Sequence, residues 1–137
     1  MDFPYIEDLG LEEERIFRPM LPVTFKANGE SFKSYALVDS GSDYTILPIE
    51  VAGILKLRLT TEREFHLQGA GGNIFRIYKS PERVEQTIEK RGFRPRKFSS
   101  HVYFAESGSV ILLGQKGFLD HLNVKLKGPK KELEVSC

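Results

Sequence analysis

From Ile16 onward, the chain consists of short runs of β-branched and aromatic residues, interrupted by proline, glycine and asparagine. Runs of this kind predict strands and tight turns rather than long helices. The pair Asn28-Gly29 favours positive φ at two successive positions, so it predicts a tight hairpin between Val23–Lys26 and Ser31–Val38. The expected fold is therefore all-β.

Further strands are predicted along the remainder of the chain. They are expected in REFHLQGAGGNIFRIY (strand, glycine tip, strand), ERVEQTIEK, RKFSSHVYFA, SVILLG and a terminal hairpin, NVKLKGPKKELEV. Two short stretches have helical character. In PIEVAGILKL four apolar residues could line one side of a short helix, and QKGFLDHL predicts a helical turn, which places one short helix in the C-terminal half.

A chain of 137 residues fits one domain with one core. Residues 1–15 are acidic and lack a regular apolar pattern, so we expect an N-terminal arm or short helix outside the core, followed by a single domain over residues 16–137. The formal charge of +1 creates no field that would steer nucleic acid. Cys137 is the only cysteine, which excludes an intrachain disulfide.

The sequence contains no apolar stretch of about 18 residues, the length that a membrane-spanning helix needs. Its first residues also lack the basic and apolar parts of a signal peptide. We therefore expect a soluble, cytoplasmic protein without a membrane partner.

The segment ALVDSGSDYTILP, residues 36–48, carries the most distinctive chemistry. An apolar strand runs directly into Asp39-Ser40-Gly41, and apolar residues resume after Tyr44. A carboxylate at the mouth of such a strand needs hydrogen bonds, and the missing side chain at Gly41 lets backbone N–H groups approach it. As a bare tripeptide, Asp-Ser-Gly would more commonly be a surface turn, but the apolar flanks weaken that alternative.

This segment resembles the active-site segment of retropepsin-like, or retroviral-type, aspartic proteases. Two further elements follow in the family's order: VILLG at residues 110–114 is similar to the apolar-apolar-glycine signature that supports the active-site loop, and LQGAGGNI at residues 67–74 looks like the flap. The resemblance covers roughly residues 16–126. It implies a closed β barrel with a flap hairpin.

The resemblance assigns roles to individual residues. Asp39 corresponds to the catalytic acid and base, Ser40 to the hydroxyl that braces the loop across a dimer, and Gly41 to a backbone donor. Ser42 stands where a hydroxyl could hydrogen-bond the carboxylate. The implied substrate-binding residues are Asp43, which binds substrate main chain in viral members, Tyr44, which replaces an acidic residue of some members and so favours a more apolar substrate side chain, and the flap tip Gly69, Ala70, Gly71 and Gly72.

Three departures from the family pattern limit what the resemblance implies about the dimer. Viral members commonly carry an arginine after the signature glycine, whereas this chain has Gln115 and Lys116. The segment 78–100 is longer and more charged, and the ends of the chain do not resemble the short interdigitating strands of viral members.

The chemistry that the resemblance implies needs two carboxylates around one water molecule, sharing a proton. Because the chain has a single Asp-Ser-Gly, the second carboxylate must come from an identical subunit related by a two-fold axis. The expected activity is that of a homodimeric aspartic endopeptidase without cofactor or metal, acting on an extended peptide. The alternative is a domain of the same fold that dimerises or binds peptides without cleaving them.

Three other features of the sequence have more ordinary explanations. KRGFRPRK, residues 90–97, resembles a nucleic-acid patch, but a solvated hairpin tip suits the near-neutral chain better, so no nucleic-acid partner is expected. His66, His101 and His121 lack the short spacing of a helical metal site. No Lys-Ser/Thr follows the glycines of GAGGNI, which argues against a phosphate-binding loop.

Overall fold

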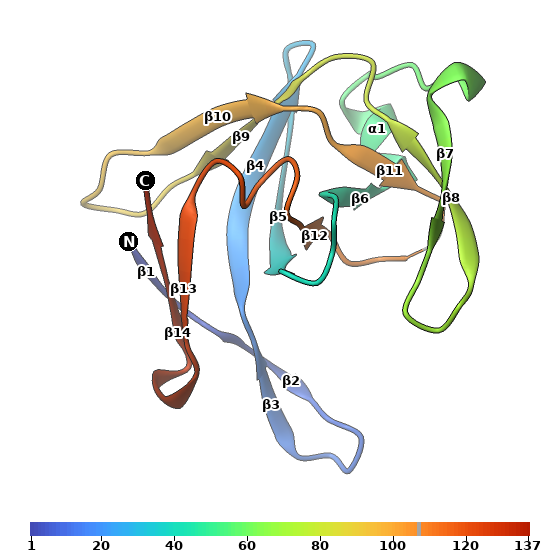
Figure 1. Ribbon diagram of the computed structural model, residues 1–137. Helices are drawn as coiled ribbons and strands as arrows, with labels where there is room; N and C mark the ends of the chain where they lie inside the picture. Colours follow the sequence, from blue (N-terminus) through green and yellow to red (C-terminus); the bar gives the residue numbers. More distant parts are fainter. Residues whose placement is uncertain (107) are drawn as a thin grey trace.

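The computed structural model describes residues 1–106 and 108–137. Figure 1 shows a molecule built almost entirely of strands, and the predicted all-β class is confirmed. The strands are β1 (Asp2–Pro4), β2 (Ile6–Leu9), β3 (Arg15–Arg18), β4 (Met20–Ala27), β5 (Glu30–Val38), β6 (Ile46–Pro48), β7 (Glu64–Gln68), β8 (Ile74–Lys79), β9 (Val84–Ile88), β10 (Arg96–Ser100), β11 (Tyr103–Ala105), β12 (Leu112–Leu113), β13 (Asn123–Lys127) and β14 (Glu132–Ser136). Helical segments are α1 (Ile49–Ile54) and two 3₁₀ turns, η1 (Thr61–Arg63) and η2 (Gly128–Lys130).

Nine strands form one curled sheet in the order β10-β9-β4-β5-β12-β6-β11-β8-β7. Most neighbours are antiparallel, but β12 lies parallel to β5, and β11 lies parallel to β6. The predicted closed barrel is not observed, because β10 and β7 remain the two edges of the sheet. Although β10 and β11 follow each other in the chain, they are not neighbours in the sheet. β10 is an edge strand, whereas β11 lies in the interior between β6 and β8.

The predicted hairpin at Asn28-Gly29 is confirmed as β4–β5. Asn28 and Gly29 have φ values of 53° and 74°, the positive angles that a two-residue turn of this kind requires. The Asn28 side chain also donates from Nδ2 to the carbonyls of Leu55 and Lys56, which ties the turn to the end of α1. The turn residues and the contact of Asn28 with the end of α1 therefore support the same register of β4 against β5.

The larger of two hydrophobic clusters lies between the curled sheet and the smaller sheet β1-β14-β13, and the smaller one consists of Ile46, Ile77 and Ala105. In β4, Leu21, Val23 and Phe25 alternate with more exposed residues and are fully buried. Leu133 of β14 joins the same cluster, together with Phe118 from the turns after β12. Burial of these large apolar side chains is the main source of stability of the fold.

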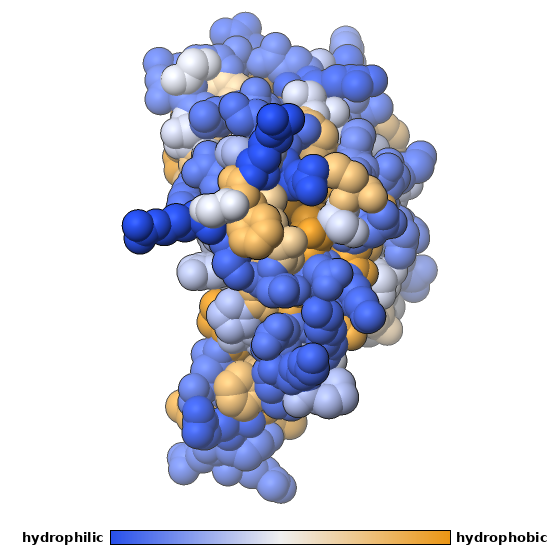
Figure 2. Space-filling model, turned by 90° about the vertical axis from the view of Figure 1, so that its left-hand side faces the viewer, coloured by the Kyte–Doolittle hydropathy of each residue, from blue (hydrophilic) through white to orange (hydrophobic). Residues whose placement is uncertain are grey.

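The first residues are built into the sheets. β1 pairs with β14, and Phe3 is a buried member of the core, so the expectation that this segment lies outside the core is wrong for Phe3. β2 and β3 form a two-stranded hairpin that spans the predicted boundary between residues 15 and 16. It projects away from the rest of the molecule in Figures 1 and 2.

The α-helix lies earlier in the chain than predicted. PIEVAGILKL forms α1 as expected, whereas residues 115–121 form successive turns and leave the C-terminal half, within the described residues, without an α-helix. Gly117 has a φ of +95°, which interrupts a right-handed helix, and the N–H groups of Leu119 and Asp120 bond to carbonyls five residues back. Within residues 1–106 and 108–137, no helix is long and apolar enough to cross a membrane.

Candidate active site

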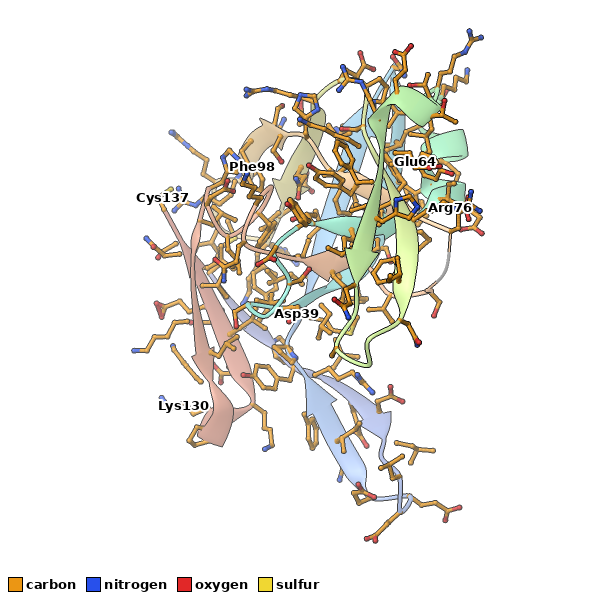
Figure 3. The ribbon with its side chains drawn as sticks, turned by 45° about the vertical axis from the view of Figure 1, so that its right-hand side comes forward. Asp39, Glu64, Arg76, Phe98, Lys130 and Cys137 are labelled. Carbon is orange, nitrogen blue, oxygen red and sulfur yellow. The ribbon has the colours of Figure 1, made fainter. Side chains whose placement is uncertain are left out.

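Asp39 is the first residue after β5 and begins the loop that leads to β6 (Figure 3). Its carboxylate accepts a hydrogen bond from the main-chain N–H of Gly41, with 3.0 Å between the nitrogen and Oδ1. A Cβ at position 41 would lie 3.3 Å from the same oxygen, closer than most real Cβ contacts. Glycine therefore allows the tight approach that the sequence analysis expected.

The loop is supported from behind by the residues that follow β12. Asp39 N donates to Leu113 O at 3.0 Å, and Gln115 N and Lys116 N donate at 2.9 Å to Ser42 O and Asp43 O. The side chain of Gln115 adds a bond from Nε2 to Ser40 O at 2.8 Å. The VILLG segment thus lies against the Asp-Ser-Gly loop, as the family resemblance implied.

Thr45 is a member of this arrangement that the sequence analysis did not identify. Its side chain is fully buried, Oγ1 donates to Lys116 O at 2.9 Å, and the same oxygen accepts from Gly114 N at 3.2 Å. These two bonds fix the end of the loop to the chain after β12. In the sequence, the sign of this role is a hydroxyl residue placed between Tyr44 and the apolar run Ile46-Leu47, where a buried side chain needs a hydrogen-bond partner.

The hydroxyl of Ser42 does not bond the Asp39 carboxylate. Ser42 Oγ donates instead to Tyr44 O at 2.7 Å, which closes the loop locally. The expected contact is absent because the carbonyl two residues later accepts the hydroxyl proton. Ser40 and Asp43 have exposed side chains, so neither is held by other groups of the same loop.

The four predicted flap residues lie together at the tip of the β7–β8 hairpin. Gly69 N donates to Asn73 O at 2.8 Å, Gly72 N donates to Gly69 O at 3.0 Å, and Gly72 has a φ of +83°. Among the described residues, no hydrogen bond joins Gly69–Gly72 to the Asp39 loop. Among residues 1–106 and 108–137, the recorded hydrogen bonds of the tip are those of its own turn.

Charged and polar side chains connect the outer part of this hairpin to Glu106. Arg76 lies 3.9 Å from Glu64 across the hairpin and 3.3 Å from Glu106, measured between nitrogen and oxygen (Figure 3). Tyr78 donates to Glu106 at 3.0 Å, and this hydrogen bond is the main reason that the pKa of Tyr78 is raised to about 12. The strands are therefore tied down at the end opposite the tip.

Two cavities are lined by residues of β8 and β11, and one of them reaches Tyr44 of the loop. One, of about 240 Å³, is lined mainly by apolar residues of β6, β8, β11 and the approach to β12, including Ile46, Phe75 and Val110. The other, of about 150 Å³, lies between Tyr44 and the aromatic residues Phe65 and Tyr103. Both have the apolar walls that suit substrate side chains.

Tyr44 and Tyr103 form an aromatic pair, with ring centroids 4.8 Å apart and an interplanar angle of 56°. Burial, and secondly repulsion from Tyr44, raise the pKa of Tyr103, so this phenol stays neutral. The residues described contain no group of three or more His, Cys, Asp or Glu side chains placed to hold a metal ion.

The sequence matches no protein-family model and no curated protein. Among solved structures, the chain is similar to one described as EIAV protease complexed with the inhibitor HBY-793. The two chains superpose with a TM-score of 0.46 and share 24% sequence identity, over 78% of this chain and 86% of the other.

Proposed function

We propose that the protein is a retropepsin-like aspartic endopeptidase that works as a homodimer. One observation carries the proposal: the Asp39 carboxylate accepts the Gly41 N–H in a loop that the chain after β12 holds from behind. A carboxylate that is oriented by a backbone donor and is partly exposed to solvent is suited to binding a water molecule.

Two such carboxylates are needed for the reaction. The ionised one takes a proton from the water as it attacks the peptide carbonyl, while the protonated one donates to the carbonyl oxygen. As the C–N bond breaks, the carboxyl group that took the water's proton passes it to the amine nitrogen, and the other carboxylate takes a proton from a hydroxyl of the tetrahedral intermediate, which restores the singly protonated pair. Two like charges this close cannot both ionise, so the pair shares a single proton. Each chain has a single Asp-Ser-Gly, so the second Asp39 comes from another copy.

The substrate is an extended peptide that lies between the loop and the β7–β8 hairpin. Gly69–Gly72 cover it, the exposed Asp43 binds its main chain, and the cavity beside Tyr44 takes one of its side chains. The glycines suit this covering role because their main chain can move without steric cost.

The second copy has to approach the side of the molecule where the Asp39 loop is open. Ser40, next to Asp39, is exposed, and Figure 3 shows Asp39 above the projecting β2–β3 hairpin. An isolated two-stranded hairpin is marginally stable in water, and this one leaves Leu9 and Leu11 exposed. The hairpin therefore supports contact with the second copy.

The test is a digest of a broad peptide library by the wild type and by Asp39→Asn, read by mass spectrometry. The expected result is cleavage by the wild type alone, with specific activity that rises with protein concentration until dimerisation saturates. Full specific activity in a monomeric sample would refute the shared-carboxylate mechanism. Peptide binding without cleavage at any pH would instead favour the binding domain.

A further inference from the structure

A third cavity, of about 280 Å³, lies beside the candidate active site, between the ends of β8 and β10 and the turns after β12. We call it the basic cleft. Its charged and ionisable lining residues are Lys79, Arg83, His101, Lys116, Asp120 and His121. The catalytic chemistry proposed above uses none of these side chains.

The basic cleft has more positive charge than its own residues neutralise. The side chains of Lys79, Arg83 and Lys116 form no ion pair or hydrogen bond with any described residue. Asp120 is the one carboxylate of the lining, and it already accepts from Gly117 N at 3.1 Å and lies 3.6 Å from His121 Nε2. Asp120 is already engaged by these contacts, so the three cationic side chains are left without a neutralising carboxylate. The cleft therefore attracts an anion.

The two histidines of the cleft are held in fixed orientations. His101 Nδ1 lies 3.0 Å from Ser80 O and 3.3 Å from Ser80 Oγ, so the ring is tied to Ser80. His121 stacks on Phe98, with ring centroids 4.5 Å apart and an interplanar angle of 12°. Both rings therefore keep their places in the lining when the cleft is empty.

The basic cleft is continuous with the proposed path of the substrate. Tyr103 lines both this cleft and the smaller cavity beside Tyr44 and Phe65. Lys116 is bridged to Tyr44, and its N–H donates to Asp43 O. An extended chain that leaves the cavity beside Tyr44 therefore reaches the basic cleft by passing over Tyr103.

We propose that the basic cleft recognises an acidic side chain of the peptide substrate, several residues from the bond that is cut. This inference rests on the proposed function. Exposed Lys and Arg side chains bind a carboxylate weakly one at a time, but three converging on one cavity select for it together. The substrates are thus peptides with an acidic residue near one end of the bound segment.

The experiment uses the full-length Asp39→Asn protein, which binds without cutting. Its ligands are a set of equal-length peptides in which a single glutamate is moved along an otherwise neutral sequence. Affinity is measured by fluorescence anisotropy, and histidine ring signals by NMR. Only three histidines are present, of which His101 and His121 line the basic cleft, whereas His66 lies on β7.

Glutamate at one end position is expected to tighten binding about tenfold at low salt, because several charged contacts act together. The same peptide should shift the ring signals of His101 and His121 further than the neutral peptide does. The variant Lys79→Gln/Arg83→Gln should lose the tenfold gain. The control Lys33→Gln/Lys125→Gln, which removes two exposed lysines outside the cleft, should keep it.

Equal binding of acidic and neutral peptides, or an equal gain in both double variants, overturns the inference. Inorganic phosphate is the second probe: if it shifts His101 and His121 while the glutamate position has no effect, the cleft binds small anions only, and the substrate role is refuted. If the wild type cleaves neutral and acidic peptides equally well, the protease proposal stands and the proposed role of the basic cleft is refuted. Glutamate-dependent binding without any wild-type cleavage would refute hydrolysis but not the cleft.

Discussion

Gly114 lies directly against the main chain of Tyr44. A Cβ built on Gly114 would overlap the Tyr44 carbonyl group and lie 2.7 Å from Ser42 O. This contact brings the chain after β12 close enough to donate its N–H groups to the loop of Asp39. The glycine is thus a requirement of the candidate site rather than of its own turn.

Gly114→Ala is expected to lower the free energy of unfolding by about 1–3 kcal/mol, as overpacking in a tight interior does. Urea unfolding followed by circular dichroism measures the change. Gly53→Ala is the matched control, because nothing lies within 4 Å of the added Cβ and the residue is in α1. There, alanine should stabilise by about 0.5–1 kcal/mol. Equal effects at both positions would contradict the steric argument.

Asp39→Asn should abolish cleavage while leaving the thermal unfolding midpoint and the dimer in place. Asparagine Oδ1 can still accept the Gly41 N–H, but the amide can neither take a proton from water nor share one with its twin. For the wild type, initial rates should fall at low pH, where both carboxylates are protonated, and at high pH, where both are ionised. A monotonic pH profile at saturating dimer concentration would exclude the shared proton.

Gly72→Val should reduce turnover more than Gly71→Val does. Gly72 has a φ of +83°, where a β-branched residue is strained, whereas a Cβ at Gly71 meets nothing within 4 Å. Both variants should keep their stability within about 1–2 kcal/mol, because the tip carries little packing. Steady-state kinetics and thermal denaturation give the two readouts. Wild-type turnover by Gly72→Val would show that the tip does not cover the substrate.

Glu106→Gln should lower the pKa of Tyr78, which now stands at about 12, because the hydrogen bond to Glu106 is the largest cause of the shift. A phenol with a raised pKa in the folded protein favours folding below its ordinary pKa of about 10 and loses that contribution as the pH rises through 12. Ultraviolet titration of the phenolate measures the pKa, with Tyr78→Phe identifying the signal. An unchanged titration in Glu106→Gln would assign the raised pKa to burial and to Glu64 instead.

Leu9→Asp/Leu11→Asp should weaken the proposed dimer without unfolding the chain. Both side chains are largely exposed, at 68% and 103%, so the substitutions disturb no core. Phe93→Asp, at an exposed site on the β9–β10 loop, is the control. Analytical ultracentrifugation should give a dissociation constant raised about tenfold or more for the leucine variant alone. The same dissociation constant in all three proteins would remove the hairpin from the interface.

Features that depend on local chemistry could be predicted from the sequence. Asn28-Gly29 sets its own turn, and the crowding at Gly41 follows from the neighbouring carboxylate. The role of Thr45 could not be predicted, because it bonds to Gly114 and Lys116, about 70 residues later. The bond of Ser42 could not be predicted for a related reason: its hydroxyl donates to Tyr44 O, and only the folded loop decides between that carbonyl and the Asp39 carboxylate.

The errors about helix and sheet have similar causes. QKGFLDHL has a helical pattern, but its turn is set by Gly117, whose carbonyl accepts from the buried side chains of Gln86 and Ser100. Phe3 appeared peripheral because its partner strand, β14, lies some 130 residues away. Periodicity within a window contains no information about either contact.

The pairing of β1 with β14 affects how two copies can meet. Lys127 reinforces this sheet by bonding to Asp2 at 3.3 Å and to Glu134 at 3.0 Å, so the three strands pair with one another within one chain. Subunits that exchange no strands can associate and dissociate as folded monomers, without refolding. For the proposed protease, dilution would therefore dissociate the dimer and abolish activity. At low expression, where monomers dominate, the number of active sites would grow with the square of the amount of protein, so the rate of proteolysis would depend steeply on abundance.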